Sequence, residues 1–263
     1  MVIEAKITAP TIITLDHGAV RELRLNHPPA NALSPQLIAA LREAVVGAPR
    51  DGARALVLSG APGMFSAGLD VPLLLTLNRA AIAEVWHDFY ALLRTLASSS
   101  VPIAAAITGH APAGGTVLLL FCDWRGMAEG DWKIGLNEVQ VGIPLPPVIF
   151  AALKRQVGSR QAERLAAGGL LISVAEAASI GLVDEALPGE RVVKRAVEWC
   201  QSLLALPPQA MAATRREARA DLVRLFEQSL DREIDEVIAN WWSDETQTVL
   251  KSLAERLAEK KST

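Results

Sequence analysis

Two short runs of apolar residues, each ending in a glycine, constrain the fold of this chain most strongly. They are "ARALVLSG", residues 53–60, and "VPIAAAITG", residues 101–109. A continuous apolar run of this length is typical of a strand that is buried on both faces. A long amphipathic stretch over residues 72–97 lies between them and predicts a helix. Strands that alternate with helices predict an α/β core in which helices cover the sheet.

The rest of the chain fits this core and adds a helical tail. Period-two patterns predict strands at residues 4–9, 11–16 and 19–26, as an antiparallel edge or meander, and further strands at 124–129 and 131–136. Ser34-Pro35 caps a helix that runs to about residue 46. Helical patterns cover residues 148–157, 160–167, 174–180 and 190–204. Pro207-Pro208 is the best candidate linker, so we divide the chain into a core, residues 1–206, and a C-terminal helical region, residues 207–263.

Composition excludes several classes of partner. The net charge is −3, and no basic run is long enough to follow nucleic-acid phosphates. The most apolar windows are too short to cross a membrane, and the N-terminus lacks the pattern of a signal peptide. The two cysteines have no metal-binding spacing, so we expect no metal site and a reducing compartment. A cytoplasmic location follows by elimination.

Two glycine-containing loops, "APGMFSAGLD" and "GHAPAGG", follow the ends of the two buried strands. Ligands of α/β proteins usually bind at that end of a sheet, where small residues allow close approach to the main chain. A helix that opens at Gly114 would aim free N–H groups at the same point. Two N–H groups from two loops would form an oxyanion hole. The alternative is that these glycines only make turns. The spacing fits neither a dinucleotide fingerprint, nor a phosphate-binding loop, nor a nucleophile elbow.

The segments "MFSAGLD", "GHAPAGGTVLLLFCDWRGMAE" and "IGLNEVQVGIP" have the order and spacing of a known family. Over nearly its whole length the chain resembles the crotonase (enoyl-CoA hydratase/isomerase) superfamily. Within it the chain is most similar to the Δ3,Δ2-enoyl-CoA isomerases. The resemblance implies a crotonase spiral of ββα units and a homotrimer or dimer of trimers, with residues 207–263 as a trimerisation or lid region. It also implies an acyl-CoA thioester as the small-molecule partner, with coenzyme A as part of the substrate and no separate cofactor.

The same resemblance assigns roles to individual residues. The oxyanion-hole N–H groups fall on Leu69 and Gly114, and the catalytic acid falls on Glu138. The substrate and its CoA moiety are expected to contact Ala30, Ala32, Ser66, Ala67, Gly68, Asp70 and Asn137. For Asn137 a role in holding its loop is an open alternative, and for Asp70 the resemblance implies a mostly structural role.

The number of carboxylates separates the possible reactions. The resemblance implies that hydratases of this superfamily carry a second glutamate at the position that Val117 occupies here. One carboxylate suffices to move a double bond from the 3-enoyl to the 2-enoyl position, because the same group takes a proton from C2 and returns it at C4. We therefore predict an enoyl-CoA isomerase. The alternatives are a weak hydratase or another CoA-thioester isomerase or lyase of this fold, and a non-catalytic acyl-CoA-binding protein.

The surroundings of Glu138 give further expectations. An apolar environment would raise the pKa of this carboxyl group, and the expected contributors are Val117, Leu118, Ile143 and Pro144. His110, next to the glycine turn, has either a catalytic role or a role in ordering that turn. The Trp241-Trp242 pair is expected at a subunit interface, with contact to a bound acyl chain as the alternative.

Overall fold

The larger of two sheets forms the centre of the molecule. The computed structural model describes residues 10–227 and 230–261, so the strand expected at residues 4–9 lies outside the described residues. The order of the six strands is β1 (Ile12–His17), β2 (Val20–Leu25), β3 (Ala55–Ser59), β5 (Ile103–Ile107), β7 (Trp124–Ala128) and β10 (Glu185–Leu187). β1 and β2 form the expected antiparallel edge, and the strands that follow are parallel. The predicted buried strands β3 and β5 expose none of their residues.

A second, smaller sheet lies where the main parallel strands end. Its strands are β4 (Gly63–Met64), β6 (Gly109–Pro112), β8 (Lys133–Gly135) and β9 (Ile172–Ser173). Each of β3, β5 and β7 is followed in the chain by a strand of the small sheet and then by helical residues. β4 and β6 lie so close that a Cβ on Gly109 would come within 1.9 Å of the Gly63 carbonyl carbon. The repeat brings the loops after β3 and β5 side by side.

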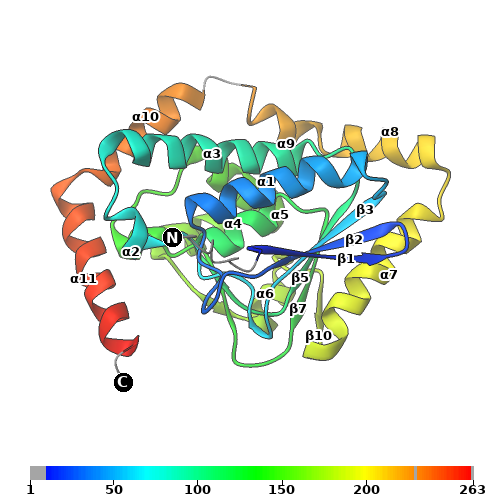
Figure 1. Ribbon diagram of the computed structural model, residues 1–263, viewed down its shortest axis with the longest axis horizontal. Coiled ribbons are helices and arrows are strands. Elements are labelled where there is room, and N and C mark those ends of the chain that lie inside the picture. Colours follow the sequence, from blue (N-terminus) through cyan, green and yellow to red (C-terminus); the bar gives the residue numbers. More distant parts are fainter. Residues whose placement is uncertain (1–9, 228–229, 262–263) are drawn as a thin grey trace, which may run out of the picture.

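Helices cover both faces of the large sheet (Figure 1). α1 (Pro35–Arg50) and α3 (Arg79–Ala97) pack against each other on one face, and α7 (Val192–Leu204) packs on β3, β5 and β7. Ser34 caps α1 as expected, accepting a hydrogen bond from Leu37 N at 3.2 Å. The helix predicted over residues 72–97 is in fact two. α2 (Val71–Leu74) ends early, and Asn78 starts α3 by accepting a hydrogen bond from Ala81 N.

Shorter elements complete the core. α4 (Gly114–Leu120) is buried along its whole length, and the 3-10 helix η1 (Glu138–Val141) follows β8. α5 (Pro147–Gly168) spans both helices expected at residues 148–157 and 160–167, and Gly158 kinks it between them with φ 76°. Along the chain, α6 (Val174–Ser179) precedes β10 and η2 (Gly189–Arg191) follows it.

The described part of the chain after residue 206 consists of helices joined by short turns. It forms α8 (Pro208–Ala218), α9 (Ala220–Arg224), α10 (Leu230–Trp241) and α11 (Asp244–Lys261). α10 packs on α3, while α11 lies at the far end of the molecule beside α2 and η1 (Figure 1). Trp241 is only 1% exposed and belongs to the core of this chain. The burial of Trp241 therefore needs no subunit interface, contrary to the expectation from the sequence, whereas for the partly exposed Trp242 the interface stays a prediction.

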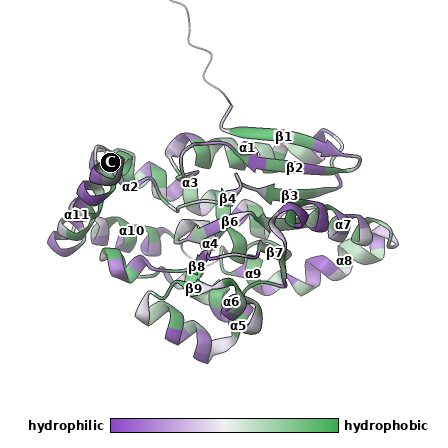
Figure 2. Ribbon diagram, turned by 90° about the horizontal axis from the view of Figure 1, so that it is seen from below, coloured by the Kyte–Doolittle hydropathy of each residue, from purple (hydrophilic) through white to green (hydrophobic). Residues whose placement is uncertain are grey.

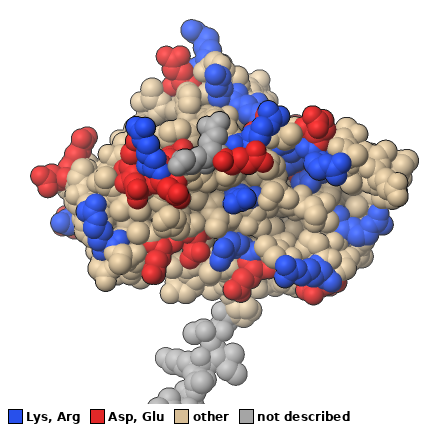
Figure 3. Space-filling view, turned by 90° about the horizontal axis from the view of Figure 1, so that it is seen from above, with Lys and Arg blue, Asp and Glu red and all other residues tan. Residues whose placement is uncertain are grey.

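The distribution of polar and apolar residues follows this layering. The strands are mostly apolar, and the outer helices alternate polar and apolar faces (Figure 2). On the face seen in Figure 3, basic and acidic side chains are interspersed. Among the described residues, no helix is both long and apolar enough to cross a membrane.

Candidate active site

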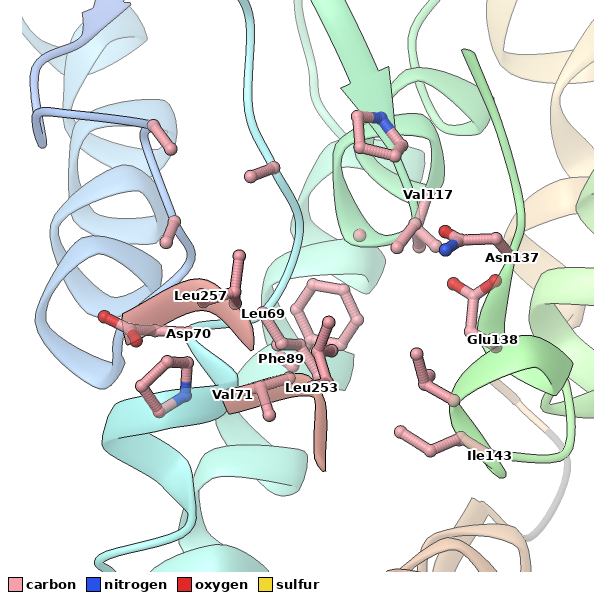
Figure 4. A pocket seen from close by; sticks show the side chains of 18 of the residues that line it. Leu69, Asp70, Val71, Phe89, Val117, Asn137, Glu138, Ile143, Leu253 and Leu257 are labelled. Atoms are coloured by element: carbon pink, nitrogen blue, oxygen red, sulfur yellow. The ribbon is translucent and has the colours of Figure 1, made fainter. Parts of the chain in front are cut away.

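A cavity of about 480 Å³ lies at the carboxyl ends of β3 and β5, where the loops of the small sheet meet α2, α3, α4, η1 and α11. Figure 4 shows Glu138 and Asn137 on one wall, with Leu69, Asp70 and Val71 on the other. Its lining is mostly apolar. Besides Glu138, the titratable groups that line it are His27 and Asp70.

Glu138 is the buried acid of this cavity. Its Oε2 atom is buried and accepts no hydrogen bond from any described residue. Burial raises the pKa of the Glu138 carboxyl group from about 4.5 to about 7, and the only opposing contribution is a hydrogen bond from its own backbone. An acid with a pKa near neutrality exchanges protons readily at that pH. Glu138 is therefore suited to act as both base and acid.

The backbone around Glu138 holds the acid in a tight turn. Gly142 ends η1 in the left-handed conformation, with φ 74°, which glycine adopts without strain. The Glu138 carbonyl oxygen accepts a hydrogen bond from Ile143 N at 3.0 Å. On the other side of the turn, Gln140 Nε2 donates to the Gly169 carbonyl oxygen at 2.8 Å. The turn is thus anchored to the end of α5.

The two expected oxyanion-hole residues lie together. Both Leu69 and Gly114 line the cavity. A Cβ built on Gly114 would lie 3.4 Å from Leu69 N and 3.1 Å from the Cα atom of Gly68, so the two loops are in direct contact. Neither Leu69 N nor Gly114 N donates a hydrogen bond to another group in the described part of the chain. Two free N–H groups at one point are the donors that an oxyanion requires.

The turn before α4 is strained and firmly tied. Ala113 has φ 49° and ψ −125°, a conformation that non-glycine residues rarely adopt. Ala113 N donates to the Gly135 carbonyl oxygen at 2.8 Å, and Gly135 N donates to Thr116 Oγ1 at 2.9 Å. Thr116 in turn donates to the Ala111 carbonyl oxygen. These bonds fix the direction of the first N–H groups of α4.

The loop of residues 61–70 is held to the earlier loop by buried polar contacts. Ser66 is fully buried, and its hydroxyl group donates to the Asn31 carbonyl oxygen at 2.7 Å and accepts from Gly68 N at 3.2 Å. Asn31 Nδ2 donates to the Phe65 carbonyl oxygen at 3.0 Å. Ser66 and Gly68 therefore lie behind the cavity wall rather than on it. Their proposed contact with substrate stays a prediction, and their observed contacts are structural.

The other predicted site residues line the cavity. They are Ala30, Ala32, Ala67, Asp70 and Asn137. The Asp70 side chain caps α2 by accepting a hydrogen bond from Leu73 N at 3.2 Å, which fits the structural role expected for it. Asn137 Oδ1 is buried and has no hydrogen-bond partner among the described residues, so this amide is available to a ligand.

The apolar wall near Glu138 agrees in part with the expectation. Val117 and Ile143 line the cavity. Leu118 is buried but does not line it, because it lies on another side of α4. Pro144 is exposed, and its predicted contribution to the wall is wrong.

Two further groups of residues line the cavity, and only the second was missed from the sequence. Trp86 and Phe89 reach the cavity from α3, and Leu253 and Leu257 reach it from α11. Figure 4 shows Leu253 and Leu257 beside Leu69 and Val71, across the cavity from Glu138. From the sequence, the aromatic stretch "WHDFY", residues 86–90, is expected to pack over the acyl pocket, and the positions of Trp86 and Phe89 at the cavity agree with that expectation. The α11 residues gave no signal, because their contact with the cavity depends on how the tail folds back.

His110 has a structural position. Its Nδ1 atom accepts a hydrogen bond from Lys133 N at 3.0 Å, and its ring packs edge-on against Trp132. His110 does not line the cavity. Of the two roles open for this residue, the geometry favours the structural one, because the bond to Lys133 N ties β6, which leads into the glycine turn, to β8.

Comparison with known proteins decides the family. The model of the family described as "Enoyl-CoA hydratase/isomerase" matches residues 16–261. The chain belongs to the enoyl-CoA hydratase/isomerase family. The α/β fold and the family expected from the sequence motifs are thereby confirmed, as is the prediction of an enzyme of this family.

Individual members of the enoyl-CoA hydratase/isomerase family are similar over nearly the whole chain. Human mitochondrial enoyl-CoA delta isomerase 1 is 32% identical, over 95% of this chain and 84% of the relative. The mouse protein of that name is 36% identical, over 93% and 86%. The crystal structure of human mitochondrial delta3-delta2-enoyl-CoA isomerase superposes with a TM-score of 0.91, covering 96% of this chain and 100% of that one. A hydratase/isomerase from Mycobacterium paratuberculosis, 26% identical, has a TM-score of 0.84 and covers 92% and 98%.

Proposed function

We propose that this protein moves the double bond of 3-enoyl-CoA thioesters to the 2-enoyl position, with Glu138 as the single proton shuttle. The observation that carries the proposal is one buried carboxyl group with a pKa of about 7, whose Oε2 atom has no hydrogen-bond partner among the described residues, and which faces two free N–H groups across an apolar cavity. The similar proteins named as delta isomerases support the same reaction class.

The proposed reaction has two proton transfers and one charged intermediate. Ionised Glu138 removes a proton from C2 of the thioester, and the electron pair of that C–H bond moves to make a dienolate. The negative charge on the thioester oxygen is stabilised by the N–H groups of Leu69 and Gly114. Glu138, now protonated, returns the proton at C4, and the double bond settles between C2 and C3. The shuttle uses only protein groups and the substrate, so we propose that no separate cofactor takes part.

The apolar cavity wall favours this reaction over water addition. Hydration needs groups that orient a water molecule and handle two protons at different positions. Val117 is 1% exposed and lines the cavity. The resemblance to this superfamily implies that hydratases carry their second glutamate at this position. The Val117 side chain can neither transfer a proton nor form a hydrogen bond to a water molecule, so we expect hydration to be slow. We propose that Ala30, Ala32 and Ala67 contact the CoA thioester.

The test uses two substrates. Purified protein with 3-hexenoyl-CoA should give the ultraviolet absorbance of a conjugated 2-enoyl thioester. With crotonyl-CoA, which is already conjugated, loss of absorbance by hydration should be at least about 100-fold slower. Comparable rates for the two substrates would instead identify a hydratase. Calorimetric binding of an acyl-CoA without turnover of either substrate would identify a non-catalytic acyl-CoA-binding protein.

Assembly and location belong to the same proposal. We propose a homotrimer or a dimer of trimers, which light scattering of the purified protein tests. A monomer in solution at micromolar concentration contradicts it. The cytoplasmic location expected from the sequence stays a prediction, and the names of the human and mouse relatives place those proteins in mitochondria.

A further inference from the structure

The C-terminal helix α11 is bonded directly to the turn that carries the catalytic acid. Thr246 Oγ1 donates a hydrogen bond to the Gly142 carbonyl oxygen at 2.5 Å. Gly142 is the residue that ends η1, and a Cβ added to it would lie 3.1 Å from Thr246 Cα. The first turn of α11 therefore packs closely on the backbone of Gly142, and a larger residue there would require the helix to shift. This contact joins positions 104 residues apart in the chain.

The donor of this hydrogen bond is itself held in place. Ser243 Oγ accepts a hydrogen bond from Thr246 N at 3.2 Å, as a helix N-cap does. The Ser243 hydroxyl group also donates to Thr246 Oγ1 at 3.0 Å, so the hydrogen of Thr246 is directed to Gly142. Thr246 is 1% exposed. Removal of a buried hydroxyl group from a series of hydrogen bonds lowers stability, because its acceptor stays buried without a donor.

The same face of α11 closes the cavity. Thr246, Leu250, Leu253 and Leu257 follow one another at spacings of four, three and four residues and so lie on one side of the helix. Leu250 is fully buried, and Leu253 and Leu257 line the cavity opposite Glu138 (Figure 4). The stripe thus begins at the turn of the acid and ends at the cavity wall.

From this geometry we propose that Thr246 is a positioning residue: its hydroxyl group fixes the end of the turn that carries Glu138 and couples closure of the cavity by α11 to the placement of the acid. η1 is anchored on one side by Gln140, bonded to Gly169, and on the other by Thr246, bonded to Gly142. Loss of the second anchor frees the Gly142 end of the turn. Loss also lets the Leu253 and Leu257 side chains withdraw, which admits water to Glu138.

The kinetic test compares variants that lack or keep the hydroxyl group. Thr246→Val removes the hydroxyl group and keeps the side-chain volume, and Thr246→Ala removes both. Thr246→Ser keeps the hydroxyl group. Thr248→Val is the matched control, because Thr248 lies on the same helix and bonds only to Asp244 within it. We expect kcat for 3-hexenoyl-CoA to fall about tenfold in the two hydroxyl-free variants, with KM within about twofold. Thr246→Ser and Thr248→Val should match the wild type.

A second readout distinguishes positioning from simple structural support. Water admitted to Glu138 relieves its burial, so the pH midpoint of kcat/KM should shift about half a unit or more toward acid in Thr246→Val. The other titratable groups that line the cavity, His27 and Asp70, are unchanged in all variants. A wild-type kcat and pH midpoint in both hydroxyl-free variants would overturn the proposal. Equal loss in Thr246→Ser would do the same, because the hydroxyl group would then not be the cause.

Hydrogen exchange tests the coupling without any substrate. The kinetic arm rests on the proposed isomerase function, but exchange of the Gly142 and Ile143 amides does not. We expect these amides to exchange about tenfold faster in Thr246→Val than in wild type and Thr248→Val. Unchanged exchange would refute the coupling whatever the substrate. Wild-type inactivity toward 3-hexenoyl-CoA with faster exchange in Thr246→Val would refute the function and support the coupling.

Discussion

The proposed role of Glu138 depends on its lack of hydrogen-bonding and charged partners among the other described residues. Its Oε2 atom accepts no hydrogen bond from a described residue, and no positive charge contributes to its pKa. Burial therefore acts almost unopposed and keeps the pKa at about 7. Glu22 provides a contrast within the same chain, because its buried carboxylate is bonded to Ser59, His17 and Arg24 and its pKa is lowered.

The raised pKa predicts that Glu138 costs stability at high pH. In the unfolded chain its pKa is near 4.5, so between pH 4.5 and 7 the folded state holds the proton more tightly. The contribution of Glu138 to stability is therefore largest below pH 4.5 and is lost as the pH rises through 7. Glu138→Gln removes this penalty, which is on the order of 3 kcal/mol. Denaturant titration should find the variant more stable than wild type at pH 8 and nearly equal at pH 4.5. A constant difference across this range contradicts the raised pKa.

The same pKa predicts the pH dependence of the reaction. Glu138 must be ionised to remove the C2 proton, so kcat/KM should rise as the pH increases through about 7 and then stay level. One ionisation is expected because one carboxylate serves both steps. The rate of 3-hexenoyl-CoA isomerisation from pH 5.5 to 9 checks this. A midpoint near 4.5 would show that the carboxyl group is solvated in the working enzyme.

At the scale of elements, α4 and the loop before α2 work as a pair. The strained Ala113 and the hydrogen bonds of Thr116 set the N-terminus of α4, and the loop of residues 61–70 brings Leu69 N beside it. The helix N-terminus adds a positive partial charge at the same point. The geometry of the oxyanion hole thus depends on two backbone segments in close contact.

Gly114→Ala should separate these segments. The added Cβ would come within 3.0 Å of Leu33 Cδ1 and 3.1 Å of Gly68 Cα, and it would push the two loops apart. We expect kcat to fall about 100–1000-fold, the usual effect of losing one oxyanion-hole donor. Gly47→Ala is the control, because no atom lies within 4 Å of a Cβ there and the site is remote on α1. A kcat within a few-fold of wild type in Gly114→Ala contradicts this oxyanion hole.

The elements also show how much of the structure could be predicted from the sequence alone. The buried strands β3 and β5 were predictable because nearly all of their residues are apolar and a glycine soon follows each of them. The strands β4 and β9, of two residues each, were not, because such short segments form only through their neighbours. The division of α2 from α3 depends on the Asn78 cap, which the amphipathic pattern hides. In the site, loop positions were predictable from motifs, whereas Leu253 and Leu257 required the path of the C-terminal helices.

At the scale of the whole molecule, a buried ion cluster holds the C-terminal helices to the core. Arg215 binds both carboxylate oxygens of Asp123 at 2.9 and 2.8 Å, and Arg219 binds the same carboxylate at 3.0 Å. Arg219 also donates to the carbonyl oxygens of Leu96, Ala97 and Phe121. Nearly all the groups in this cluster are satisfied, and it lies away from the cavity. We therefore assign it to stability.

Asp123→Asn should destabilise the fold without changing the chemistry. It leaves the buried guanidinium group of Arg219 and the partly buried one of Arg215 without their counter-charge, and we expect the free energy of unfolding to fall by about 3–5 kcal/mol. The kcat of the folded fraction should stay at the wild-type value. Asp131→Asn, which breaks only the exposed pair with Lys133, is the control and should leave stability unchanged. Equal denaturation midpoints for wild type and Asp123→Asn contradict this role.

The central claim is that one carboxyl group carries the proton in both directions, and Glu138→Gln tests it most directly. Glutamine keeps the size and shape of the side chain but cannot accept a proton from C2. With 3-hexenoyl-CoA as substrate, the formation of conjugated 2-enoyl-CoA should fall about 1000-fold or more. Circular dichroism and thermal unfolding should show an intact fold. Activity near that of wild type in the folded variant would contradict the claim, because another group would then be moving the proton.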